Sequence, residues 1–343
     1  MRLPWTPNRP SLNLALQGGG AHGAFTWGVL DALLEDGRLQ LDAISGTSAG
    51  AMNAVVLAQG LMDGGTEGAR RALRTFWTAV AGSLPFEGAV PTADGTSFRL
   101  APAMQWMLQW TQHLSPEQLN PFDHNPLREL LRDQIDFEAL RHHSPVRLFI
   151  AATEANTGRL RLFQNPALSL DALLASACLP RLHHSVVIDG QPHWDGGFSA
   201  NPAVFPLLLE GRTRDILLVL LTPLAWDHTP RTPPDIEQRT MELAFNATFL
   251  REMRLYADLR QRLLRVRWWP NGPLERRLLQ ARFHAIGPGD ALRDLGTETK
   301  AAAGKRFFER LFALGREQGL HWLQTHGQAV GNRDSVDLQP WLG

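Results

Sequence analysis

Eleven residues near the start of the chain, Ile44–Ala54, constrain the fold more than any other stretch. They contain the pattern Gly-x-Ser-x-Gly, formed by Gly46, Ser48 and Gly50. A nucleophilic serine must leave a strand on a tight turn and enter a helix at once, because only then does its hydroxyl stand exposed at the positive end of the helix. Side chains two residues either side of the serine would collide in such a turn, so both glycines are required for this nucleophile elbow.

A second glycine-rich segment, Gly18–Gly23, lies between a strand predicted at Ser11–Leu16 and a helix predicted at Ala24–Glu35. Consecutive glycines let backbone N–H groups approach a reacting carbonyl oxygen, and the following helix adds its positive end. A serine nucleophile needs such a device, and here one lies a single strand–helix unit upstream. We therefore predict an oxyanion hole formed by Gly18, Gly19, Gly20 and Gly23.

Both glycine patterns have other interpretations. The Ser48 turn also fits an ordinary N-capped helix start. The upstream segment also matches the dinucleotide-binding pattern Gly-x-Gly-x-x-Gly, which needs an acidic residue about 20 positions on. Asp42 is near that distance, but its strand continues through Ala43–Ile44 into the Ser48 turn, where the ribose would have to bind. We therefore expect the oxyanion hole rather than a nucleotide site.

A third pattern, Asp195-Gly196-Gly197, follows a strand predicted at Ser185–Ile188. A serine nucleophile needs a base, and Asp195 on a flexible double-glycine loop can supply one. The alternative is a glycine-rich turn in which the aspartate caps the backbone.

Composition limits the class of protein. The 343 residues are 44% hydrophobic, which is ample for a core. Lysine plus arginine and aspartate plus glutamate both number 34, so the net charge gives no reason to expect a nucleic-acid partner. The single cysteine, Cys178, forms no internal disulfide and suits a reducing compartment.

The sequence shows neither a signal peptide nor a membrane-spanning segment. No apolar h-region follows the charged, proline-rich start. The longest apolar run, Ile216–Ala225, is too short for a bilayer and predicts a buried strand. We expect a soluble, cytoplasmic protein, and peripheral contact with the inner membrane stays open.

Two segments carry two interpretations each. Within a proline-rich insertion at about 82–126, Met104–Trp110 predicts an apolar helix that is either a mobile lid over an acyl pocket or a packed surface insertion.

A long helix predicted at Asp235–Arg267 is basic in its second half and ends in tryptophans. The stretch Arg251–Trp269 thus fits an anionic lipid surface or, as the sequence favours, a solvated charged face.

Strands alternate with helices along the chain, which predicts an α/β protein with a mostly parallel sheet covered on both faces. With its three motifs in this order, the chain resembles the patatin-like phospholipase family, in its bacterial, soluble branch, over about residues 11–222. The resemblance implies a three-layer α/β/α sandwich related to the α/β-hydrolases. Residues 223–330 would then be a helical segment completing the same domain, with loosely ordered tails at 1–10 and 331–343.

The resemblance also implies a chemistry. Ser48 and Asp195 would form a dyad without histidine, act through an acyl-enzyme on lipid esters such as phospholipids or lysophospholipids, and need neither metal nor cofactor. One position departs from the family, which usually has arginine or lysine where His22 stands. A neutral histidine there contributes mainly hydrogen bonding and would make activity depend on pH.

Two rival functions stay open. An α/β-hydrolase with a Ser-Asp-His triad needs a histidine after the acid, and His228 and His284 are the candidates. A non-catalytic lipid-binding or interaction protein on the same scaffold is the other rival, although such a protein has no chemical need for Ser48 and Asp195. The sequence leaves the oligomeric state undetermined.

Overall fold

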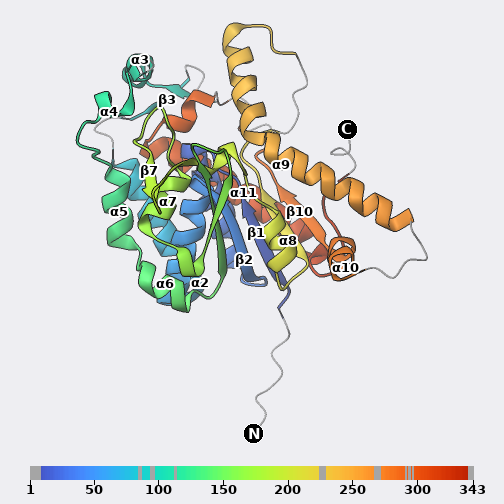
Figure 1. Ribbon diagram of the computed structural model, residues 1–343. Helices are drawn as coiled ribbons and strands as arrows, with labels where there is room; N and C mark the ends of the chain where they lie inside the picture. Colours follow the sequence, from blue (N-terminus) through green and yellow to red (C-terminus); the bar gives the residue numbers. More distant parts are fainter. Residues whose placement is uncertain are drawn as a thin grey trace.

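The computed structural model describes residues 9–83, 87–92, 97–111, 114–223, 229–265, 272–289, 292, 295 and 297–338. At its centre is an eight-stranded sheet (Figure 1). In sheet order its strands are β10 (Arg282–Ile286), β9 (Asp215–Val219), β1 (Ser11–Leu16), β2 (Gln40–Thr47), β5 (Arg147–Glu154), β8 (Gln191–Asp195) and β7 (Val186–Ile188), with β6 (Leu160–Gln164) also paired to β5.

The sheet is mostly parallel. All neighbouring pairs from β10 to β5 run in the same direction. Strands β6, β7 and β8 are antiparallel additions at the β5 end. Parallel strands buried on both faces read as nearly continuous apolar runs, as β9 does, where all five residues are buried.

Alternation of side chains along the strands divides the core into two layers. In β1, Leu14 and Leu16 point to one face, and Ala15 points to the other. The first face is covered by α1 (Gly23–Asp36), α2 (Ala49–Ala81), α5 (Pro126–Gln134), α6 (Phe137–His143), α7 (Leu170–Ser176) and α11 (Lys305–His326). The second is covered by α8 (Phe205–Glu210), α9 (Pro233–Arg265) and α10 (Pro273–Gln280). The predicted three-layer α/β/α sandwich is thus confirmed.

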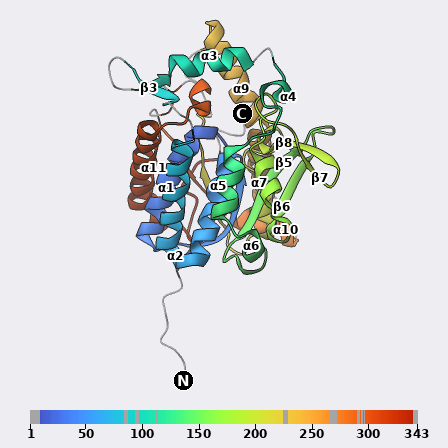
Figure 2. The same cartoon turned by 90° about the vertical axis from the view of Figure 1, so that its left-hand side faces the viewer.

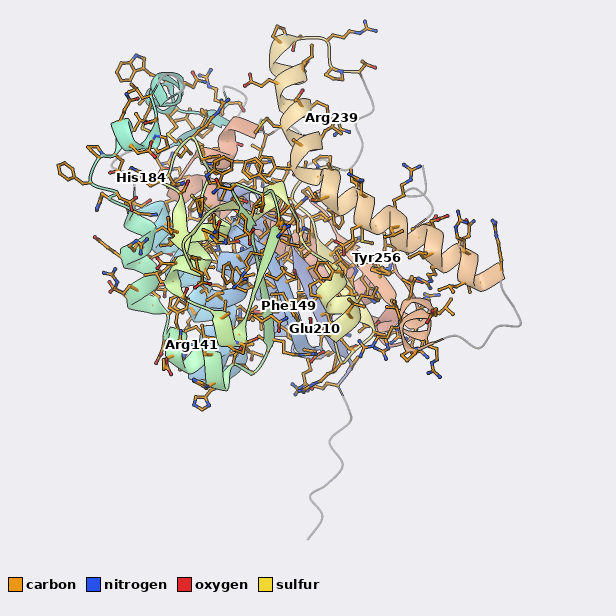
Figure 3. All side chains as sticks on the ribbon, viewed as in Figure 1. Arg141, Phe149, His184, Glu210, Arg239 and Tyr256 are labelled. Carbon is orange, nitrogen blue, oxygen red and sulfur yellow. The ribbon has the colours of Figure 1, made fainter. Side chains whose placement is uncertain are left out.

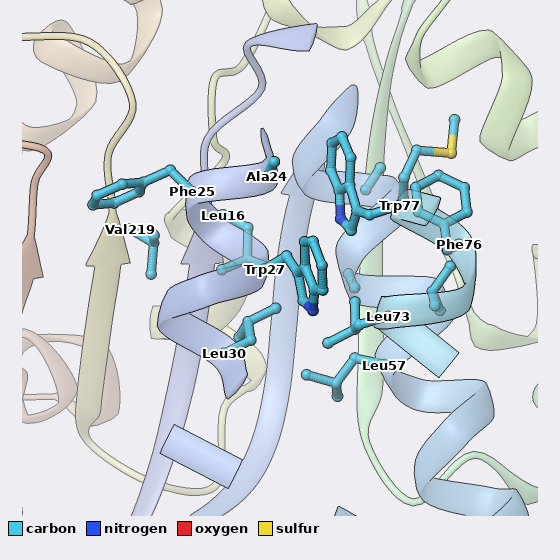
Figure 4. Packing of buried hydrophobic residues seen from close by; sticks show 14 of the residues in the cluster. Leu16, Ala24, Phe25, Trp27, Leu30, Leu57, Leu73, Phe76, Trp77 and Val219 are labelled. Atoms are coloured by element: carbon cyan, nitrogen blue, oxygen red, sulfur yellow. The ribbon is translucent and has the colours of Figure 1, made fainter. Parts of the chain in front are cut away.

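Aromatic side chains fill the layer between α1 and α2 (Figure 4). Trp77 is buried, and its indole Nε1 donates to Asn53 Oδ1 at 2.9 Å. The Asn53 amide in turn donates to the carbonyl of Gly23 at 3.0 Å. Because buried polar groups must be paired, this chain of bonds fixes the start of α1 against α2. Helix α2 is broken at Gly64–Gly65, where the backbone leaves the helical conformation.

Helices α1 and α11 pack side by side (Figure 2), and glycines bring their backbones together. A Cβ on Gly315 would lie 1.9 Å from the carbonyl oxygen of Phe25, and one on Gly28 would lie 2.1 Å from that of Phe312. No side chain fits in such a contact. The carboxy-terminal helix is therefore locked onto the first helix of the chain.

Several elements differ from the sequence-based expectations. Strand β8, the short pair β3 (Ala89–Pro91) and β4 (Phe98–Leu100), and helix α10 were not predicted. Within the predicted helical segment 223–330, a 3-10 turn at Thr297–Ala301 precedes α11. Residues 331–338, expected to be loose, are anchored, because Asp334 pairs with Arg260 at 2.9 Å and accepts from the Phe283 amide at 2.8 Å.

Replacing Gly315 by alanine tests the close α1–α11 contact. Alanine is the better helix former by up to about 1 kcal/mol, but its methyl group has no space here, so we expect a net loss of roughly 1–3 kcal/mol in unfolding free energy. Thermal unfolding followed by circular dichroism measures it. Gly287→Ala is the control, since a Cβ there meets nothing within 4 Å. A Gly315→Ala variant as stable as the wild type would contradict this packing.

Candidate active site

The sheet register brings the serine turn and the aspartate loop together. On β5, Ala151 pairs with Thr47 of β2, and the next residue, Ala152, pairs with Asp195 of β8. Because β6 occupies the other edge of β5, β8 must run along the edge that β2 has just left. Ser48, which follows Thr47, thus lies beside Asp195, although 147 positions separate them in the sequence.

Ser48 occupies the strained turn that the sequence predicted. Its φ of 54° and ψ of −122° lie in a region that non-glycine residues rarely adopt, between the end of β2 and the start of α2. A Cβ on Gly46 would lie 2.6 Å from the carbonyl oxygen of Gly50, and one on Gly50 would lie 2.2 Å from that of Leu16. Neither glycine position therefore has space for a side chain.

Asp195 is buried and in contact with Ser48. The residue is 2% exposed, and its Oδ1 accepts from the Gly197 amide at 2.7 Å. Burial raises the pKa of this carboxyl to about 6, while the hydrogen bonds from Gly197 and the Ser48 hydroxyl oppose the rise. The Asp195 carboxylate thus lies against the Ser48 hydroxyl, and the raised pKa of the carboxyl suits a general base.

Two residues that the sequence analysis missed support this pair. The Ser48 amide donates to Ser176 Oγ at 3.0 Å, so a hydrogen bond joins the turn to α7. The hydroxyl of Thr153 on β5 donates to the Asp195 carbonyl at 2.8 Å. A fully buried serine within the apolar run of α7 is a signal that could have identified Ser176, because a buried hydroxyl needs a partner.

The glycine loop lies directly against Ser48. A Cβ on Gly18 would be 2.8 Å from Ser48 Cβ, and the Gly18 amide already donates to Asn201 Oδ1 at 2.7 Å. The Gly23 amide faces back into the preceding 3-10 turn, Gly20–His22. The amides of Gly19 and Gly20 have no partner within the described part of the chain, and these two glycines reach the surface. Of the four predicted oxyanion-hole glycines, Gly19 and Gly20 thus have amides free to bind an anion.

His22 turns away from the loop surface into the core. Its Nε2 lies 2.8 Å from Thr299 Oγ1, and its ring packs edge-on against Phe307. Burial, with a further effect from the charge of Lys300, lowers the pKa of His22 to about 3. The ring is therefore neutral near pH 7, and it is not a cation that titrates in that range.

The carboxy-terminal segment completes the wall of the loop. Gly20 has a φ of +54°, and a Cβ on it would lie 2.2 Å from the carbonyl oxygen of Lys300. The side chain of Lys300 is partly buried, and burial lowers its pKa. The backbone at residue 300 thus forms the wall of the loop, and no local sequence motif marks this residue.

Within the described residues, no rival site is assembled around Ser48. Both ring nitrogens of His284 are engaged, by Asp215 at 3.0 Å and by Ser335 at 2.8 Å. The other candidate, His228, lies outside the described residues. Asp42, needed for a nucleotide site, lies near the amino end of β2 and binds Arg147 at 2.7 Å, at the opposite end of the strand from the glycine loop. Within the described residues, no group of His, Cys, Asp and Glu is arranged to bind a metal ion.

The insertion and the amino-terminal part of α9 lie near the carboxyl ends of the parallel strands, whereas the basic second half of α9 runs across a face of the sheet (Figures 1 and 2). Helix α3 (Pro102–Thr111) buries Met104 and leaves Trp106 64% exposed. Helix α9 packs on the sheet through Phe249, Met253 and Tyr256, the last labelled in Figure 3, and exposes Arg251 to solvent. The side chain of Trp110 and the tryptophans at 268–269 lie outside the described residues. In the described chain, no helix combines the length and the apolar content needed to cross a bilayer.

A three-layer α/β/α fold with a serine on a strained strand-to-helix turn defines a class of proteins built like the serine hydrolases. The family model of the patatin-like phospholipases matches residues 14–208, which is more than half of the chain. The chain therefore belongs to the patatin-like phospholipase family, and the resemblance seen in the sequence is confirmed.

Two solved structures are similar to the chain. VipD from Legionella pneumophila is 15% identical, with a TM-score of 0.41, over 94% of this chain and 68% of its own. The type III effector protein ExoU is 16% identical, with a TM-score of 0.28, over 95% of this chain and 81% of its own. No curated protein matches the chain.

The buried charge of Asp195 makes a prediction about stability. A carboxyl whose pKa rises from 3.8 to about 6 on folding stabilises the fold while it is protonated and loses that contribution as the pH rises through about 6. This loss amounts to roughly 3 kcal/mol at neutral pH. Asparagine keeps the bond from Gly197 and can exchange its bond with the Ser48 hydroxyl. We expect Asp195→Asn to be more stable than the wild type by about 1–3 kcal/mol at pH 7.5, with a smaller difference at pH 5.

Denaturant unfolding at both pH values measures this difference, with Asp133→Asn as the control at an exposed position of α5. A variant at Asp195 that is less stable than the wild type at pH 7.5 would show that the buried charge is compensated by the fold.

Proposed function

We propose that this protein is a serine acyl hydrolase of lipid esters, of the phospholipase A or lysophospholipase type. Family membership supports lipid hydrolysis in general. The observation that carries the finer proposal is the position of the Ser48 hydroxyl beside the buried carboxylate of Asp195, whose pKa it lowers, next to the free amides of Gly19 and Gly20. Nucleophile, base and anion site thus meet at the carboxyl ends of β1 and β2.

In the first half of the proposed reaction, Asp195 accepts the proton of the Ser48 hydroxyl as its oxygen attacks the ester carbonyl. The carbonyl oxygen becomes an anion, which accepts hydrogen bonds from the Gly19 and Gly20 amides, with the positive end of α1 close by. Asp195 then returns its proton to the leaving alcohol, and the acyl group stays on Ser48.

In the second half, water attacks the acyl-enzyme and gives its proton to Asp195. The same two amides hold the second oxyanion. When the fatty acid leaves, Asp195 returns the proton to Ser48, so the residues end in their starting states. A base with a pKa of about 6 is ionised at neutral pH and still basic enough to accept a proton in the transition state.

The remaining parts of the proposal concern context. We infer that residues 11–222 form the catalytic core and that 223–330 complete the same domain, because β10 extends the sheet and α11 packs on α1. We propose a cytoplasmic location with peripheral contact at the inner membrane, since exposed apolar residues of α3 lie near the end of the sheet that carries Ser48.

Chemical labelling tests the nucleophile. A fluorophosphonate probe should label the wild type strongly. It should label Asp195→Asn weakly, because asparagine cannot accept the serine proton, and it should not label Ser48→Ala. Hydrolysis of p-nitrophenyl butyrate should fall by about a thousandfold or more in both variants, since each removes a member of the catalytic pair. The matched control is Ser45→Ala, because the buried Ser45 hydroxyl has no partner among the described residues.

Other outcomes distinguish the rivals. If His284→Asn abolishes turnover and Asp195→Asn does not, a histidine triad replaces the dyad. If the folded wild type neither reacts with the probe nor turns over ester, even with vesicles present, the non-catalytic alternative holds.

The pH dependence tests the base. Because Asp195 must be ionised to accept a proton, kcat/KM for p-nitrophenyl butyrate should rise with pH through a midpoint of about 6 and level off above it. In His22→Gln the pH midpoint should not move, even if the maximal kcat/KM changes, because the pKa of His22 is about 3. Stopped assays over pH 4.5–8, with circular dichroism at each pH, measure this. A midpoint near 4, or one that shifts in His22→Gln, would contradict the assignment.

A further inference from the structure

A polar cavity lies between α5, α7 and β7, beside the candidate active site. Its volume is about 360 Å³, within the range typical of small-molecule sites. Polar side chains provide much of its lining, among them Asp123, Arg128, Asp171, His183, His184 and Ser185. In Figure 3, His184 lies on this side of the molecule, and its Nε2 is 3.2 Å from the carbonyl of Pro116 in α4 (Pro116–Leu119).

The cavity is joined to the catalytic pair through the end of α7. Ser176 accepts from the Ser48 amide, and the next two residues, Ala177 and Cys178, line the cavity. The carbonyl of Cys178 also accepts from the Asp195 amide at 2.8 Å. Two residues span at most about 7 Å, so the cavity wall begins within one headgroup length of the nucleophile turn. A second cavity, lined by Leu12, Gln40 and Val146, lies at the opposite, amino ends of the strands.

The charges in this cavity are unevenly matched. Arg128 pairs with Asp171 at 2.9 Å across one side. Asp123, on the loop before α5, lines the same cavity and has no ion pair within the described residues. His183 contributes a buried Nδ1 that has no hydrogen-bond partner in the described part of the chain. One guanidinium thus faces two carboxylates, and a carboxylate and an imidazole nitrogen are left to bind a ligand.

We propose that this cavity is the headgroup subsite of the enzyme and that it takes a phosphoethanolamine group. The phosphodiester lies against Arg128 and His183, and the primary ammonium donates to Asp123. This inference rests on the proposed function for its lipid substrate, but the cavity and its charges do not depend on catalysis.

The residue types decide between headgroups. A primary ammonium donates hydrogen bonds to a carboxylate, and a charged pair of this kind is stronger than a neutral hydrogen bond. Quaternary ammonium groups are held by cages of aromatic rings, and none of the described residues that line this cavity is Trp, Tyr or Phe. The exposed carboxylate of Asp123 also repels headgroups with a net negative charge, such as phosphoglycerol. The cavity therefore selects ethanolamine over choline and over glycerol.

Binding of soluble headgroups tests the subsite directly. Isothermal titration calorimetry of the Ser48→Ala protein with sn-glycero-3-phosphoethanolamine, sn-glycero-3-phosphocholine and glycerophosphoglycerol uses ligands without an ester-linked acyl chain. We expect the ethanolamine diester to bind about tenfold or more tighter than the other two. Three affinities within about twofold of one another, or no binding of any, would overturn the proposal.

Two variants separate the parts of the subsite. Asp123→Asn should abolish the ethanolamine preference, and asparagine tolerates the φ of 48° at this position. Arg128→Gln should weaken all three diesters alike and keep the preference. Asp133→Asn, exposed on the same helix and outside the cavity, is the matched control and should bind as the parent does. A preference that survives in Asp123→Asn would also overturn the proposal.

Turnover distinguishes this inference from the proposed function. The wild type should hydrolyse lysophosphatidylethanolamine with a kcat/KM about tenfold or more above that for lysophosphatidylcholine, and the ratio should approach one in Asp123→Asn. If no ester is hydrolysed but the ethanolamine diester still binds selectively, the proposed function fails and the subsite stands. If both lipids are hydrolysed equally well, the subsite fails and the proposed function stands.

Discussion

The position of the candidate active site depends on the close packing of the Ser48 turn against strand β1. The start of α2 approaches β1 so closely that a methyl group on Gly50 would meet the Leu16 carbonyl at 2.2 Å. That contact fixes where α2 begins, and it also holds the end of β1 and the glycine loop beside Ser48. A loosened contact would therefore disturb the strain at Ser48 and the position of the loop together.

The second determinant is the edge of β5. Strand β2 ends at Thr47, and β8 takes its place along the same edge one residue later, at Ala152. An antiparallel addition to a parallel sheet thereby brings Asp195 to the strand end where Ser48 leaves the sheet. Burial at this junction raises the pKa of Asp195, so the position that provides the contact also provides the basicity. The buried charge lowers the stability of the folded protein, as residues of active sites commonly do.

Much of this was predictable from the sequence, and what was missed has physical reasons. The elbow, the glycine loop and the parallel strands have local signals, because each needs particular residues at fixed spacing. Strand β8 was missed, since it is held by pairing with β5 and β7 and its residues include Pro192 and Asp195. Ser176, Asn201 and Lys300 were also missed as neighbours of the site. Their roles come from tertiary contacts between residues far apart in the chain, which no local pattern encodes.

The contact between Gly20 and Lys300 has a consequence for protein synthesis. The glycine loop is made about 280 residues before the segment that walls it, a delay of tens of seconds at ordinary rates of elongation. Helix α11, which locks onto α1, is made later still. A nascent chain can thus expose Ser48 and Asp195 while its anion site is still unfinished. The geometry that we propose for hydrolysis therefore becomes complete only after residue 300 and α11 have been made.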